Sequence, residues 1–160
     1  MSLPPGRPAA LTYLIVDDDP GDIMMIADIL ESLAGSRVVH SVGDGREALD
    51  FLRRVGRYAD APRPDVILLD LNMPRMDGRE TLTAIKAAPA LRTIPVVVFS
   101  TSTADSDVDA CLSRYANAYV AKPVEFSQLE SALQAIDGFF GQLAQLGRPA
   151  SALNDESSAA

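Results

Sequence analysis

The sequence predicts an α/β protein with a doubly wound, five-stranded parallel sheet and five helices. Short apolar runs alternate along the chain with segments whose apolar residues recur at helical spacing. Three of the runs are closed by charged residues: Asp17 and Asp18, Asp70, and Lys122. Such runs are typical of buried parallel strands, whose carboxyl ends meet at one crevice. We therefore expect these charges to lie close together.

The strands are predicted from runs rich in branched apolar residues, bounded by turn residues. In chain order they span residues 12–16, 38–42, 66–70, 95–100 and 118–121. The polar segment 56–64 contains two prolines and is predicted to be a loop.

Helices are predicted between the strands from apolar residues at a spacing of three and four. They span 20 to about 33, 46–55, 78–88, 103 or 104 to about 115, and 127–146. Asp19 is expected to cap the first helix, with Pro20 at its first position. The last helix has its core residues at Leu129, Leu133, Ile136, Phe140 and Leu143.

Length and composition indicate one globular domain. The chain has 160 residues, of which 48% are hydrophobic and 22% charged. We expect the domain to span 11–146, between a flexible N-terminus at 1–10 and a flexible tail at 147–160, because the tail is small and polar.

The charge balance and cysteine count exclude several function classes. A net charge of −8 argues against nucleic-acid binding, which needs clustered Lys and Arg. Cys111 is the only cysteine, so an intramolecular disulfide and a multi-cysteine zinc site are excluded, and a reducing cytoplasm is expected. No apolar run approaches the roughly 20 residues that cross a membrane, and the N-terminus does not have the pattern of a signal peptide.

The strand-end carboxylates are the main candidates for chemistry. Asp70 is either a turn or helix cap, or a nucleophile that forms an aspartyl phosphate. Asp17 and Asp18 repel each other, and a divalent cation with a preference for oxygen ligands would relieve that repulsion. Mg²⁺ suits one or two carboxylates together with water and phosphate oxygens. The alternative for this pair is a solvated acidic turn.

Three further residues lie in the last two predicted strands or at their ends. Lys122 is either a surface lysine or a partner for a phosphoryl oxygen or for Asp70, and Pro123 permits a cis peptide. Ser100 is either a helix cap, in competition with Ser102 and Thr103, or a hydroxyl donor to a phosphoryl oxygen. Tyr119 is either a core residue or a side chain that switches rotamer.

Taken together, these residues resemble the receiver domain of two-component response regulators, which has a flavodoxin-like fold. The resemblance covers 11–140, with five elements in the right order at the right strand ends. It matches Asp17 and Asp18 to the acidic pair, Asp70 to the phosphoacceptor, Ser100 and Tyr119 to the switch residues, and Lys122-Pro123 to the lysine. Ser100 stands where threonine is frequent, so its coupling to Tyr119 is expected to be looser.

The resemblance implies a phosphorelay function without a classical enzyme activity. A histidine kinase donates a phosphoryl group to Asp70, assisted by Lys122 and Mg²⁺. Asp18, Asp70 and the Asn72 backbone carbonyl hold the metal, and Asp17 acts on it mainly through water. Ser100 then moves toward the phosphoryl group, and Tyr119 turns inward.

The resemblance also suggests partners. Segments 16–22, 58–65 and 70–74 are similar to the small stand-alone regulators that partner bacterial phytochrome histidine kinases. Output is expected through protein–protein contact or relay to a histidine phosphotransfer protein, because no further domain follows 146. Phe139 and Phe140 are adjacent in the last helix, so one of them leaves the core face, which favours a homodimer at this end.

Two alternatives to a phosphorylated receiver remain at the level of sequence. A small phosphohydrolase of the haloacid dehalogenase type would use Asp17 as its nucleophile, but the chain lacks the later strand-end acidic pair and the cap domain of that class. The other alternative is an adaptor that binds partners without phosphorylation, which leaves the complete set of site residues unexplained.

Overall fold

The structure is a computed structural model that describes residues 10–102 and 104–146. Over residues 142–146 it describes the backbone alone. Parallel strands form its centre. The strands are β1 (Leu11–Val16), β2 (Arg37–Val42), β3 (Val66–Leu69), β4 (Val96–Ser100) and β5 (Ala118–Ala121). They form one parallel sheet in the order β2-β1-β3-β4-β5. This is the predicted doubly wound, flavodoxin-like arrangement.

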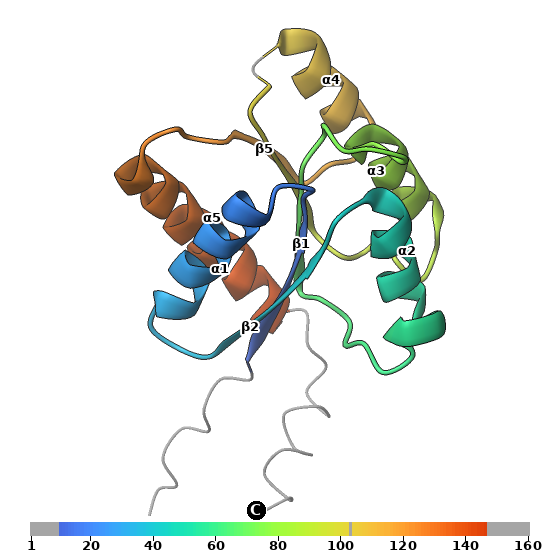
Figure 1. The fold of residues 1–160 in the computed structure, drawn as a ribbon, viewed down its shortest axis with the longest axis horizontal. Helices are drawn as coiled ribbons and strands as arrows, with labels where there is room; N and C mark the ends of the chain where they lie inside the picture. Colours follow the sequence, from blue (N-terminus) through green and yellow to red (C-terminus); the bar gives the residue numbers. More distant parts are fainter. Residues whose placement is uncertain (1–9, 103, 147–160) are drawn as a thin grey trace, which may run out of the picture.

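Helices cover both faces of the sheet (Figure 1). They are α1 (Pro20–Ser32), α2 (Gly45–Arg53), α3 (Gly78–Ala87), α4 (Asp105–Ser113) and α5 (Phe126–Leu146). Helices α1 and α5 lie on one face, and α2, α3 and α4 lie on the other. No helix within the described ranges is long and apolar enough to cross a membrane.

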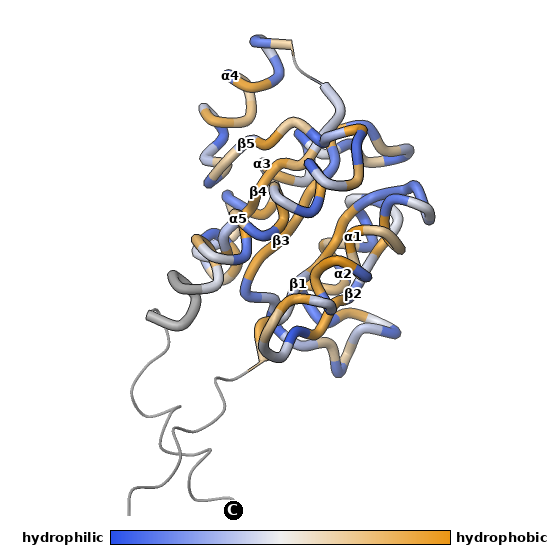
Figure 2. Tube along the Cα trace, turned by 90° about the vertical axis from the view of Figure 1, so that its left-hand side faces the viewer, coloured by the Kyte–Doolittle hydropathy of each residue, from blue (hydrophilic) through white to orange (hydrophobic). Residues whose placement is uncertain are grey.

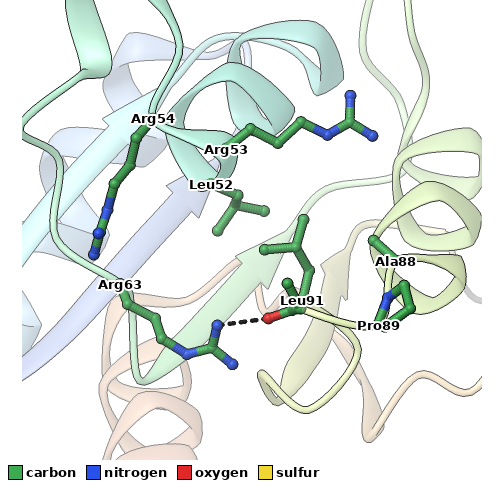
Figure 3. A pocket seen from close by; sticks show the side chains of 8 residues that line it. Leu52, Arg53, Arg54, Arg63, Ala88, Pro89 and Leu91 are labelled. Atoms are coloured by element: carbon green, nitrogen blue, oxygen red, sulfur yellow. Dashed lines mark hydrogen bonds between the residues drawn. The ribbon is translucent and has the colours of Figure 1, made fainter.

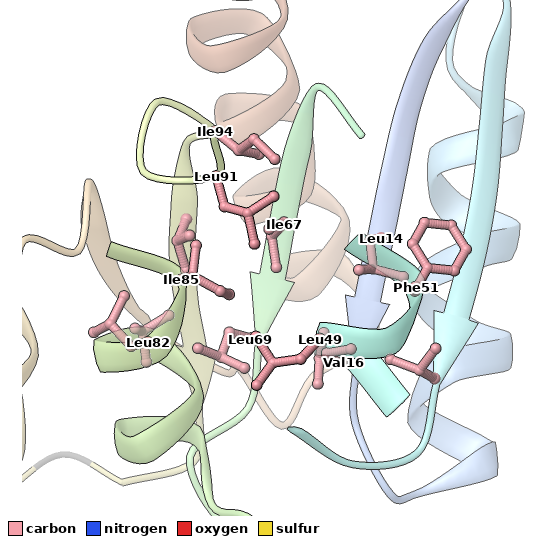
Figure 4. Close-up of a cluster of buried hydrophobic side chains, with 14 of the residues drawn as sticks. Leu14, Val16, Leu49, Phe51, Ile67, Leu69, Leu82, Ile85, Leu91 and Ile94 are labelled. Atoms are coloured by element: carbon pink, nitrogen blue, oxygen red, sulfur yellow. The ribbon is translucent and has the colours of Figure 1, made fainter. Parts of the chain in front are cut away.

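The strands divide their side chains between two cores because successive residues point to opposite faces. The α2–α3 core contains Leu14 and Val16 of β1 and Ile67 and Leu69 of β3, which Figure 4 shows. It also contains Val96 and Val98 of β4. The α1–α5 core takes the alternate residues: Leu11, Tyr13, Ile15, Val66, Leu68, Val97 and Phe99. Figure 2 shows this hydrophobic band along the central strands, with hydrophilic residues on the outer surfaces of the helices.

A partly buried polar cluster connects α5 to the sheet. Asp137 accepts hydrogen bonds from Arg37 Nε and NH2 at 2.7 and 2.6 Å, and from the Tyr13 hydroxyl at 2.6 Å. Burial opposes ionisation of Asp137, but the hydrogen bonds from Arg37 and Tyr13 outweigh it and hold its pKa below the usual range. The cluster therefore joins β1, β2 and α5 through a charged pair.

Most predicted elements are confirmed, with ends that differ by one or two residues. The strand predicted to include Asp70 ends at Leu69, and the first helix ends at Ser32, with Leu33 as its cap. Asp19 caps α1 by accepting a hydrogen bond from Gly21 N–H, as predicted. The second helix ends at Arg53 instead of Val55, because Arg54 adopts a left-handed conformation that closes it.

The structure adds detail to one predicted loop and decides one alternative that the sequence left open. Segment 56–64 begins with a 3₁₀ turn, η1 (Gly56–Tyr58), closed by a hydrogen bond from Ala59 N–H to Gly56 O. The cap of α4 is Ala104, which makes no side-chain capping bond, so Ser100 and Ser102 do not serve as caps. Thr103, the other residue considered as a cap, lies outside the described residues.

Other predictions concern single side chains. Cys111 is buried in the α2–α3 core, and His40 packs against Phe51 with ring centroids 5.4 Å apart. Phe140 is buried and Phe139 is 62% exposed, as the adjacency of the two residues predicts. The side chain of Leu143, segment 147–160 and residues 1–9 lie outside the described part of the chain.

Candidate functional site

Two strand-end carboxylates are side by side because their strands are neighbours. Val16 and Leu69 are paired in register, so Asp17 and Asp70 follow at the same edge of the sheet. Carboxylate oxygens of Asp17, Asp18 and Asp70 lie within 4.8 Å of one another. Asp17 is buried, Asp70 is half-buried and Asp18 is exposed. The predicted cluster of acids therefore forms, and it is open to solvent on the side of Asp18.

Lys122 provides the positive charge facing these acids. Its ammonium is 2.8 Å from Asp17 Oδ2, 3.0 Å from Asp22 Oδ2 and 3.9 Å from Asp70 Oδ2. The contact with Asp70 that the sequence predicts is thus the longest of the three. Reasoning from sequence missed Asp22, although it stands in the first turn of the helix that Asp19 and Pro20 begin. The Lys122–Pro123 peptide is trans.

Burial and charge shift the pKa values of Asp70 and Lys122. Burial raises the pKa of Asp70, and the Asp17 charge adds to this, while Lys122 opposes it. Burial alone would lower the pKa of Lys122, but its hydrogen bonds to Asp17 and Asp22 outweigh that effect and raise it. Lys122 is therefore a fixed cation across the physiological pH range.

The backbone of Asp70 is held by the start of α3. Gly78 N–H donates a hydrogen bond to Leu71 O at 3.0 Å. A Cβ atom at Gly78 would lie 2.2 Å from the Asp70 carbonyl oxygen, so only glycine allows this approach. Asn72 N–H makes a long contact of 3.4 Å with Asp70 Oδ1. The turn after β3 therefore presents the Asp70 carboxylate while its backbone is packed against α3.

Asp17 and Asp70 differ in how their oxygens are occupied. Asp17 Oδ1 accepts a hydrogen bond from Asp19 N–H at 2.9 Å, and Asp17 Oδ2 accepts one from Lys122 at 2.8 Å. The contacts of Asp70 are longer: its Oδ1 is 3.4 Å from Asn72 N, and its Oδ2 is 3.9 Å from the Lys122 ammonium. Asp70 is thus the less engaged carboxylate and the better placed to form a new bond.

Ser100 and Tyr119 lie on neighbouring strands beside the acids. Ser100 ends β4 and is fully buried, and its Oγ accepts a hydrogen bond from Ser102 N–H at 3.3 Å. The Tyr119 ring packs against the α2–α3 core, and its hydroxyl donates to Ser102 O at 2.7 Å. Both residues therefore contact Ser102, a link that the sequence pattern did not indicate.

The donor set fits a hard divalent cation. Asp17, Asp18 and Asp70 offer only carboxylate oxygens, which Mg²⁺ and Mn²⁺ prefer over softer ligands. No histidine or cysteine belongs to this cluster, so it lacks the ligands typical of a zinc site.

Comparison with known proteins identifies the family. The model of the response regulator receiver domain matches residues 13–134. The chain belongs to the response regulator receiver family. This match does not favour the dehalogenase-like alternative, and the engagement of both Asp17 oxygens speaks against Asp17 as a nucleophile.

The similar receivers include a phytochrome response regulator. Response regulator Rcp1 of Synechocystis sp. is 38% identical over 127 residues, which cover 79% of this chain and 86% of Rcp1. The phosphorylated cyanobacterial phytochrome response regulator RcpA has a TM-score of 0.79 and 42% identity, over 82% of this chain and 94% of RcpA. The Mn²⁺-bound form of Rcp1 has a TM-score of 0.76 and 37% identity, over 81% of this chain and 94% of that structure. This receiver is therefore related to phytochrome response regulators.

Proposed function

We propose that this receiver accepts a phosphoryl group on Asp70 from the phosphohistidine of a histidine kinase. The observation that carries the proposal is the contrast between neighbouring carboxylates. Both Asp17 oxygens accept hydrogen bonds, at 2.9 and 2.8 Å, whereas the contacts of Asp70 with Asn72 N–H and Lys122 are longer and its side chain retains 12% exposure. A phosphoryl group can approach Asp70 from solvent and still meet the Lys122 ammonium.

In the transfer, an Asp70 carboxylate oxygen forms a bond to phosphorus while the bond between phosphorus and the kinase histidine nitrogen breaks. The electron pair of the broken bond stays on that nitrogen. Lys122 remains protonated throughout and neutralises charge on the phosphoryl oxygens. Its hydrogen bonds to Asp17 and Asp22 fix its position, so the protein contributes mainly by positioning and by electrostatic stabilisation.

Asp18 and Asp70 would hold a Mg²⁺ ion directly, with the Asn72 backbone carbonyl as a further ligand and Asp17 acting through water. When bound, the metal supplies additional positive charge for the phosphoryl oxygens. The support is the oxygen-only donor set, together with the Mn²⁺-bound form of the similar protein Rcp1.

Phosphorylation would be read out by Ser100 and Tyr119. The Ser100 hydroxyl would donate a hydrogen bond to a phosphoryl oxygen, and Tyr119 would turn inward. Both residues contact Ser102 at the start of the β4–α4 loop, so their movement would change the surface formed by α4, β5 and α5. This change would act on partners through protein contact.

A bacterial phytochrome kinase is the favoured donor, because similar regulators such as RcpA are phytochrome response regulators. A histidine phosphotransfer protein is a further candidate partner. A homodimer through α5 is proposed because Phe139 is 62% exposed and stacks edge-on against Phe140. A monomer in sedimentation at micromolar concentration would contradict this dimer.

Intact-mass spectrometry tests the phosphoacceptor. The chain is incubated with acetyl phosphate, with and without Mg²⁺, beside the variants Asp70→Asn and Asp17→Asn. We expect a single phosphoryl adduct that needs Mg²⁺ and is absent from Asp70→Asn.

Asp17→Asn is the matched control, because it changes the neighbouring carboxylate in the same way. It is expected to slow adduct formation without moving the adduct to another residue. An unchanged adduct on Asp70→Asn would disprove the assignment. Turnover of a small phosphoester that depends on Asp17 would instead favour the dehalogenase-like alternative.

A further inference from the structure

Ser102 joins three parts of the receiver through separate atoms. Its N–H donates to Ser100 Oγ at 3.3 Å, and its carbonyl accepts from the Tyr119 hydroxyl at 2.7 Å. Its own hydroxyl donates to Asp107 Oδ2 at 2.5 Å. Any displacement of Ser100 or Tyr119 must therefore move Ser102 or break a bond to it.

Asp107 ties this residue to α3. The other Asp107 oxygen, Oδ1, accepts from Arg79 NH2, so Asp107 in the first turn of α4 is paired with Arg79 in the first turn of α3. Hydrogen bonds from Ser102 and Arg79 lower the pKa of Asp107, so it is charged at neutral pH. Charged hydrogen bonds of this kind are stronger than neutral ones.

Arg79 is close in the chain to the residue that packs against the phosphoacceptor. Arg79 directly follows Gly78, which packs against the backbone of Asp70 and Leu71. A chain of contacts therefore leads from the backbone of Asp70 through Arg79, Asp107 and Ser102 to the two proposed switch residues. Ser102 is thus connected to the acidic site in two ways: through Ser100 at the end of β4, and through Asp107 and Arg79 at the start of α3.

We propose that Asp107 is a positioning residue that, through Ser102 and Arg79, holds Ser100 and Tyr119 in the arrangement seen here, and that this arrangement opposes phosphorylation of Asp70. This inference rests on the proposed function and adds its regulation. Asp107 does not touch the phosphoryl group. Ser102 is either bonded to Asp107 or released from it, and Asp107 favours the bonded arrangement. A group bound at Asp70 shifts this equilibrium only by the difference between its affinities for the two arrangements. Part of its binding free energy is therefore spent on breaking the bond between Ser102 and Asp107.

The test uses beryllofluoride with Mg²⁺, because this complex binds aspartate in the shape of a phosphoryl group. Its affinity is measured by calorimetry on the full chain and on Asp107→Asn, Ser102→Ala and Arg79→Gln. Asp107→Asn is expected to bind beryllofluoride about three- to tenfold more tightly than the unmodified chain. The reason is that the charged hydrogen bond from Ser102 to Asp107 no longer has to be broken when beryllofluoride binds.

Ser102→Ala isolates the link, because it removes only the hydroxyl and keeps the backbone bonds to Ser100 and Tyr119. It should raise the affinity in the same direction. The matched control is Asp105→Asn, an exposed acid in the same helical turn with no described partner, and its affinity should equal that of the unmodified chain. The double variant Arg79→Gln with Asp107→Asn should bind beryllofluoride no more tightly than Asp107→Asn alone, because Arg79 acts through Asp107.

A residue that merely stabilised the fold would lower the free energy of unfolding without any gain in affinity. Unchanged or weaker binding in Asp107→Asn would therefore overturn the proposal. The Tyr119 ring resonances of Asp107→Asn should also shift, before ligand is added, toward their positions in the bound form. Failure of the unmodified chain to bind beryllofluoride would count against the proposed function instead, so the two failures are distinguishable.

Discussion

The two ends of the sheet use charged side chains in different ways. At the carboxyl ends of the strands, the carboxylates of Asp17, Asp18 and Asp70 face one another around Lys122. At the opposite end, Arg53, Arg54 and Arg63 line a pocket of about 560 Å³ between α2 and the α3–β4 connection (Figure 3). Leu52 and Leu91 form apolar parts of its wall.

Two of the three arginines at this second end, Arg54 and Arg63, donate hydrogen bonds to the backbone. Arg63 donates to Ala90 O at 2.7 Å, and Arg54 donates to Ala61 O at 2.9 Å. Nearby, Lys86 donates to Ile94 O and to Asn117 Oδ1. The three accepting carbonyls lie in the segments that connect α2 to β3 and α3 to β4. These cations therefore stabilise the connecting segments, whereas the acids at the first end gather around a single cation.

The largest difference between the two ends of the sheet is expected in the rate of phosphorylation. Lys122→Met should slow adduct formation from acetyl phosphate by roughly 100-fold or more, because it removes the fixed charge that faces the phosphoryl oxygens. Arg63→Met removes a cation at the other end and should change the rate less than about twofold, within the range of surface substitutions. Time-resolved mass spectrometry gives both rates. Equal slowing in the two variants would mean that the ends do not differ in this way.

A smaller effect is expected on the free energy of unfolding, from a change at the second end. Arg63→Met should reduce the free energy of unfolding by about 1 kcal/mol, because Ala90 O and Thr93 Oγ1 lose a charged donor. Arg53 lines the same pocket but has no hydrogen bond or ion pair with the described residues, so Arg53→Met should stay within about 0.5 kcal/mol. Urea unfolding measures both, and an equal loss would show that Arg63 acts by charge alone.

The smallest effect concerns the cost of gathering acids at the first end. Burial raises the pKa of Asp70 in the folded chain, so its ionised form weakens the fold at neutral pH, and this cost disappears as pH falls below the ordinary aspartate value. Asp70→Asn should raise the free energy of unfolding at pH 7 by roughly 0.5 kcal/mol, because it removes a charge that is partly buried among other acids. The gain should vanish near pH 3 in thermal unfolding. A variant less stable than the unmodified chain at pH 7 would contradict this.

Several features of the site were predictable because they depend on local pattern. Short apolar runs, and the charges that close them, predicted Asp17 and Asp70 at the same edge of the sheet. Asp19 as the cap of α1 followed from a neighbouring proline. The 3₁₀ turn η1 escaped prediction because it depends on the positive φ of Gly56, which composition does not reveal.

Local sequence therefore determined the order of elements, the two faces of each strand and the carboxylates at the strand ends, because those depend on spacing of two and of three to four residues. Tertiary structure alone decided which groups meet. The bonds from Lys122 to Asp17 and Asp22 join residues 105 and 100 positions apart, and the order of strands brings them together. The link from Asp107 to Arg79 likewise depends on how α4 packs beside α3, and no local pattern encodes that packing.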